Sequence, residues 1–153
     1  MDNLYNTLLA LHSGLRYIVL LLIGLALLLS VIALFARKDY TETNRKLSLF
    51  AMISTHTQLI FGFILYFFSP LVNYRNMAEA MKDTMTRYWT VEHSVMMIFA
   101  VILITVGHIR AKKAVIALNK HRAIALYYGL AVLVILLAIY QSGRPLLGMT
   151  LNN

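Results

Sequence analysis

Four long apolar runs constrain this chain more than any other feature of its sequence. Each run approaches or exceeds the ~20 residues that a helix needs to cross about 30 Å of hydrocarbon. Backbone amides inside lipid have no water to bond, so segments of this kind fold as helices. The sequence therefore predicts an all-α, integral membrane four-helix bundle that forms a single transmembrane domain over 1–153. The predicted spans are about 13–36, 47–71, 88–109 and 124–144.

Composition agrees with a membrane protein. Hydrophobic residues make up 60% of the chain and charged residues 13%, whereas a soluble domain averages about 45–50% and roughly 25%. The chain has no cysteine, which excludes disulfides, Cys-ligated zinc and iron–sulfur clusters. It also lacks the motifs of nucleotide, phosphate or hydrolysis chemistry. A self-contained enzyme is therefore not expected.

The basic residues gather at one end of the predicted bundle. The net charge is +8, and nine of the 14 Lys and Arg residues lie in the short loops 37–46 and 110–122, which we call the basic end. This placement argues against a nucleic-acid partner. It follows the positive-inside rule, by which short loops rich in Lys and Arg stay in the cytoplasm. We expect both loops to be cytoplasmic and both chain termini to lie on the other, non-cytoplasmic side of the cell inner (plasma) membrane. We call that opposite end the terminal end.

Histidines are the most informative polar residues of the predicted spans, because ionisable groups inside a bilayer are costly and indicate function. Depth counting places His12 and His93 near the terminal end, and His56, His108 and His121 nearer the basic end. Two imidazoles on facing helices at equal depth can clamp a porphyrin between them. The pattern predicts haem b, one or two molecules. His12 and His93 would ligate one, and His56 with His108 or His121 would ligate the other.

Three further residues are candidates for contact with the haem. Arg16 lies one helical turn from His12 and is a candidate partner for a haem propionate, although an arginine here can also bind lipid phosphate. Arg144 is predicted at the same depth and is a second propionate candidate. Gly14 would allow a flat macrocycle to approach the backbone, or would serve close helix packing.

These residues resemble those of a known class of protein. The segment Leu11-His12-Ser13-Gly14-Leu15-Arg16-Tyr17, with His56 in the second span and His93 and His108 in the third, resembles the small four-helix b-type membrane cytochromes of the cytochrome b561-like and copper-resistance-D-like kind. The resemblance covers the four spans. It implies haem b, iron binding and electron transport to or from a quinol or a redox partner protein, often within a larger quinol-linked membrane complex.

Two other functions remain open at this point. A cofactor-free accessory or assembly subunit would use its histidines as polar contacts between helices and other membrane subunits. A small metal or proton transporter would use His56, Gln58, Glu92 and the methionines, but the chain lacks the inverted repeats and broken helix pairs of many transporters. A visible absorption spectrum separates a haem protein from both alternatives.

Overall fold

The computed structural model describes residues 2–143, and these residues form helices and no strands. Four helices are long and apolar enough to cross a membrane, which confirms the predicted all-α fold. The elements in chain order are α1 (Asp2–Ala36), α2 (Glu42–Phe68), α3 (Met77–Ala80), α4 (Thr84–Arg87), η1 (Tyr88–Glu92), α5 (His93–Lys113) and α6 (Ala117–Gln141).

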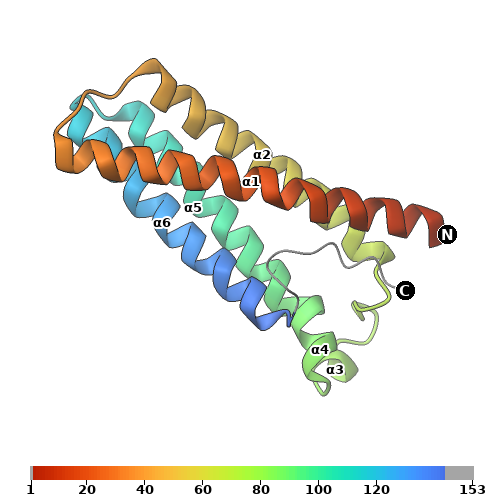
Figure 1. Ribbon diagram of the computed structural model, residues 1–153. Helices are drawn as coiled ribbons and strands as arrows, with labels where there is room; N and C mark the ends of the chain where they lie inside the picture. The colour runs from red at the N-terminus through yellow and green to blue at the C-terminus, as the bar shows by residue number, and fades with distance from the viewer. Residues whose placement is uncertain (1, 144–153) are drawn as a thin grey trace.

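The long helices form two antiparallel hairpins. Helices α1 and α2 make the first hairpin, and α5 and α6 make the second, with α1 also packed on α6 and α2 on α5. Figure 1 shows the hairpins close together at the ends joined by their short loops and diverging toward the terminal end. The long connection from α2 to α5, which contains α3 and α4, lies at that open end.

The loops of the basic end are short, and the one between α1 and α2 caps the start of α2. Thr41 caps α2 by accepting from the backbone N–H of Asn44, and the Asn44 side chain accepts from the backbone N–H of Thr41, a reciprocal pair that stabilises a helix start. The second hairpin needs close backbone approach at Gly107, where an added Cβ would lie 2.7 Å from Cβ of Tyr127. Small residues at such crossings let membrane helices pack tightly.

The interior is apolar through the middle of the bundle, where Ile23, Ile104, Ile124 and Tyr128 are almost fully buried. Only 17–39% of the residues in the central window of each span are buried inside the protein. The remaining apolar side chains face outward, which in a soluble protein would make a very large exposed patch. A lipid bilayer is therefore the environment of this surface.

The helices extend beyond the predicted spans. Helix α1 begins at Asp2 rather than near 13, and α2, α5 and α6 also begin earlier or end later than the apolar runs. The extra turns contain polar residues, which are compatible with helix once it leaves the hydrocarbon. At about 1.5 Å per residue, the 35 residues of α1 span about 52 Å.

Candidate cofactor site

A cavity of about 420 Å³ lies where the two hairpins diverge. All four long helices and η1 contribute to its walls, and most of the wall surface is apolar. Its polar lining includes His12, Arg16, Gln58 and His93. Volumes of about 300–1,000 Å³ with apolar walls and a few convergent polar groups are typical of small-molecule and cofactor sites.

The first hairpin holds His12 in place through two contacts with α2. The side-chain amide of Gln58 donates to the His12 backbone carbonyl at 2.8 Å. One turn later, Gly62 lies against the imidazole, so an added Cβ would be 2.9 Å from His12 Cε1. Since Gln58 and Gly62 are four residues apart, they share one helix face, and that face fixes where the His12 ring can lie.

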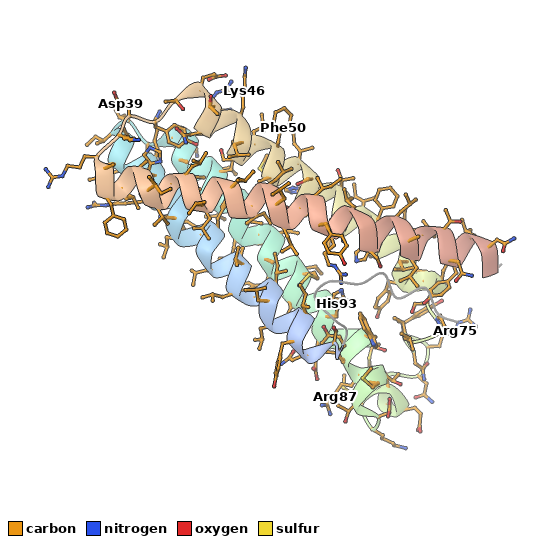
Figure 2. The ribbon with its side chains drawn as sticks, viewed as in Figure 1. Asp39, Lys46, Phe50, Arg75, Arg87 and His93 are labelled. Carbon is orange, nitrogen blue, oxygen red and sulfur yellow. The ribbon has the colours of Figure 1, made fainter. Side chains whose placement is uncertain are left out.

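The second hairpin presents His93 through a π-helical turn. In η1 the His93 backbone N–H bonds to the Tyr88 carbonyl, five residues back, as in other π-turns, which occur often at functional sites. This wider turn brings together side chains five residues apart: Arg87 Nε donates to Glu92 Oε1 at 2.7 Å, and Tyr88 Oη lies 3.4 Å from His93 Nδ1. Figure 2 shows the labelled His93 in the angle between the hairpins.

The Tyr88 hydroxyl selects the tautomer of His93. Tyr88 is 3% exposed, and its Oη donates its one hydrogen to the Ala138 carbonyl of α6. Toward His93 the phenol oxygen therefore accepts, and His93 Nδ1 carries the proton that it donates. A neutral imidazole protonated on Nδ1 has its lone pair on Nε2. Metal-ligating histidines commonly donate their other ring N–H in this way.

The π-turn is itself anchored to its surroundings. The Thr90 carbonyl accepts from Tyr66 Oη of α2 at 3.0 Å, and Thr90 Oγ1 accepts from the Asn73 backbone N–H at 3.0 Å. The Trp89 ring lies 5.1 Å from the His93 ring, centroid to centroid. Contacts from α2, α6 and the connecting segment therefore fix His93 before any ligand arrives.

Arg16 brings a positive charge to the cavity. Its Nη2 donates to Tyr17 Oη at 3.2 Å, and its guanidinium lies 5.1 Å from the centre of the Tyr17 ring. Its Nε is buried and has no hydrogen-bond partner among residues 2–143, and no ion pair among those residues includes Arg16. Arg16 is half-buried, and a cation in the wall of a mostly apolar cavity favours a ligand that carries an anionic group.

Gln58 offers a second polar group to the same space. Its Oε1 is buried and has no hydrogen-bond partner among residues 2–143, although its Nε2 bonds to α1. Buried acceptors without a donor are rare in folded proteins. Arg16 and Gln58 therefore add a guanidinium and a side-chain amide to the lining of the cavity.

The other predicted histidines do not line this cavity. His56 is exposed on α2, where Nδ1 bonds to the Met52 carbonyl of its own helix at 2.8 Å and Nε2 lies 3.4 Å from Thr105 Oγ1. His108 is buried, with Nδ1 3.1 Å from Ser48 Oγ, and lines a separate cavity at the basic end. His121 is fully buried beside Tyr40. Of the two predicted haem pairs, the structure brings only His12 and His93 to one cavity.

Gly14 and Arg144 are the remaining residues that were predicted to contact a haem. Gly14 does not line the cavity, and an added Cβ there would meet nothing within 4 Å. Arg144 lies outside the described residues. Within 2–143, no group of three or more His, Asp or Glu side chains is arranged to hold a metal ion.

Sequence reasoning missed Gly62 and the role of Tyr88. Gly62 had a usable signal, because it lies one turn after Gln58 on the same face of an apolar helix. Tyr88 had only its place at the membrane interface, which is also typical of an aromatic belt. Comparison with known proteins finds no matching family model, no matching curated protein and no matching solved structure.

Proposed function

We propose that this protein is a membrane electron carrier that binds one haem b in the terminal-end cavity, where His12 and His93 would hold the haem iron. The observation that carries the proposal is that two imidazoles, one from each hairpin, line a single cavity of about 420 Å³. Neutral imidazole nitrogen is a common ligand of haem iron, and helical bundles build cofactor sites from inward side chains of facing helices.

The chain's own residues fit such a group. Gln58 and Gly62 fix His12, and Tyr88 holds the Nδ1 proton of His93 so that Nε2 carries the lone pair. The Arg16 guanidinium supplies a counter-charge for a carboxylate such as a propionate. When bound, haem supplies reversible one-electron chemistry at its iron.

The proposal is for one haem at this site. The second predicted haem, between His56 and either His108 or His121, has weaker support, because His56 lines neither cavity described in 2–143 and its ring is exposed.

The charge distribution supports an orientation. With the loops 37–46 and 110–122 in the cytoplasm, the haem cavity opens toward the non-cytoplasmic side of the inner membrane. The electron donor or acceptor there would be a quinol from the bilayer or a redox partner protein, and the chain would act as a subunit or partner of a larger quinol-linked complex.

A reduced-minus-oxidised absorption spectrum of the purified full chain tests this function. We expect a Soret band in the natural protein and in His56→Ala, and loss of that band in His12→Ala and His93→Ala. The His56→Ala variant is the matched control, because it removes an imidazole of equal size from outside the cavity.

Two results would count against the proposal. A natural protein without any haem signal, when expressed with ample haem, would leave the cofactor-free accessory or assembly subunit as the better interpretation. Unchanged spectra in both His12→Ala and His93→Ala would remove these residues from the site.

A further inference from the structure

A second cavity, of about 190 Å³, lies at the basic end. Three of its lining side chains are cationic and come from three different helices: Arg45 from α2, Lys112 from α5 and Lys120 from α6. The proposed electron-carrier function makes no use of this cavity.

The positive charge of this cavity is only partly compensated. Its one carboxylate is Glu42, which is bonded to Arg45 by two contacts of 2.6 and 2.8 Å. No ion pair among residues 2–143 includes Lys112 or Lys120, and Lys120 Nζ lies 5.6 Å from the centre of the Tyr40 ring. Two ammonium groups therefore share a concave site without a carboxylate partner.

A partly buried hydrogen-bond network adjoins the cavity through two of its lining residues, His108 and Tyr40. His108 is 8% exposed, and its Nδ1 lies 3.1 Å from Ser48 Oγ. Ser48 Oγ donates to the Arg45 carbonyl and lies 3.2 Å from Tyr40 Oη, while the Ser48 carbonyl accepts from Tyr128 Oη at 2.7 Å.

Tyr40 adds a neutral donor to the lining of the cavity. Burial raises the pKa of its phenol above the ordinary value, so the hydroxyl keeps its proton. The network joins α2, α5 and α6, the three helices that supply the cationic lining residues.

We propose that this cavity binds a phosphate group, and that its source is the headgroup of an anionic phospholipid. Arg and Lys are the usual partners of phosphate oxygens. The cavity lies where the spans end, at the level of lipid headgroups, and basic pockets between transmembrane helices on the cytoplasmic side bind such headgroups. A bound phosphate would link the first hairpin to the second at the basic end.

Ligand-dependent thermal unfolding of the full-length protein in a non-ionic detergent tests the proposal, because a ligand that binds only the folded state raises the unfolding midpoint. The probes are phosphatidylglycerol, phosphatidylcholine and inorganic phosphate. We expect phosphatidylglycerol to raise the midpoint and phosphatidylcholine to leave it unchanged.

Paired variants locate the effect. Lys112→Gln with Lys120→Gln should raise the phosphatidylglycerol concentration for half-maximal shift by about tenfold or more. Lys113→Gln with Arg122→Gln is the matched control, because it removes the same charge from the same loop region at residues that do not line the cavity. The single variant Lys112→Gln, at an exposed residue, serves where the double variant folds poorly.

Each remaining outcome is decisive. Inorganic phosphate that raises the midpoint by itself and displaces the lipid identifies the free ion as the ligand and supports the phosphate site. Phosphate without effect supports the lipid headgroup. Equal shifts with phosphatidylglycerol and phosphatidylcholine, or equal losses in the two double variants, would overturn the proposal in favour of a diffuse surface charge.

Discussion

The two ends of this bundle are built from the same four long helices and differ in almost every other respect. At the basic end the connections are short, the hairpins lie close together, and nine Lys and Arg residues face only Asp39 and Glu42. At the terminal end the α2–α5 connection is long and the hairpins diverge around an apolar cavity with histidines on both sides. In Figure 2, Asp39 and Lys46 lie at the basic end, and Arg75 and Arg87 lie at the terminal end.

The difference shows how the length of a connection affects whether the helix ends that it joins pack tightly or leave space for a ligand. A short loop forces two helices into contact at its end, which favours tight packing. A long connection leaves the far ends free to separate, so the chain can surround a ligand there. The stability of the fold should therefore depend mainly on the basic end, and haem affinity on the terminal end.

The largest effect on folding is expected at Gly107. In Gly107→Ala the added Cβ would lie 2.7 Å from Tyr127 Cβ and 3.2 Å from the Tyr128 ring, so the α5–α6 crossing must open. Overpacking of this kind costs about 1–3 kcal/mol. Thermal or denaturant unfolding in detergent measures the loss. Gly129→Ala is the control, because its Cβ would be 3.8 Å from Leu27 Cδ1, an ordinary contact.

An intermediate effect is expected at Gly62. In Gly62→Ala the new methyl group would displace the His12 ring, from which it would lie 2.9 Å. Displacing a metal-ligating side chain such as His12 weakens metal binding by about tenfold or more. Haem loss, measured as the rate of transfer to apomyoglobin, should be faster in this variant and stay unchanged in Gly14→Ala, where the added atom meets open space. Equal rates in both variants would contradict the assigned position of His12.

The smallest effects come from deleting one buried hydroxyl at each end. Tyr128→Phe removes the bond to the Ser48 carbonyl and should cost about 1 kcal/mol of folding free energy, with no change in the haem spectrum.

Tyr88→Phe removes the acceptor of the His93 Nδ1 proton. It should weaken haem binding by about two- to tenfold, since a single hydrogen bond contributes about 0.5–1.5 kcal/mol, and should shift the midpoint potential.

Unfolding curves and redox titrations of the two tyrosine variants check this comparison directly. If Tyr128→Phe moved the potential as much as Tyr88→Phe, the assignment of stability to one end and haem binding to the other would be wrong.

The four spans and the depth of each histidine were accessible from sequence, because apolar length and a rise of 1.5 Å per residue follow directly from the chain. Depth counting placed His12 and His93 at one level, and both line one cavity. What sequence could not supply is the direction in which a side chain leaves its helix.

His56 illustrates the reason. In water, a polar residue on an amphipathic helix marks the solvent side, but in a membrane both the core and the lipid are apolar, so periodicity does not separate the two faces. His56 was predicted to ligate a haem, but its ring is exposed. In the polar run around it, Ser54, Thr55 and Thr57 bond to carbonyls of their own helix, as His56 does, and only Gln58 reaches α1.

The π-turn at 88–92 was also beyond prediction, because it depends on contacts from three other parts of the chain. A π-turn contains one residue more than the α-helical turn it replaces, so η1 adds one extra residue at the N-terminal end of α5. Shortening the chain by that residue would let a regular helix run from Thr84 to Lys113 and would rotate the tyrosine away from the imidazole without disturbing Gly107. Length at this point, more than side-chain identity, sets the orientation of the candidate ligand.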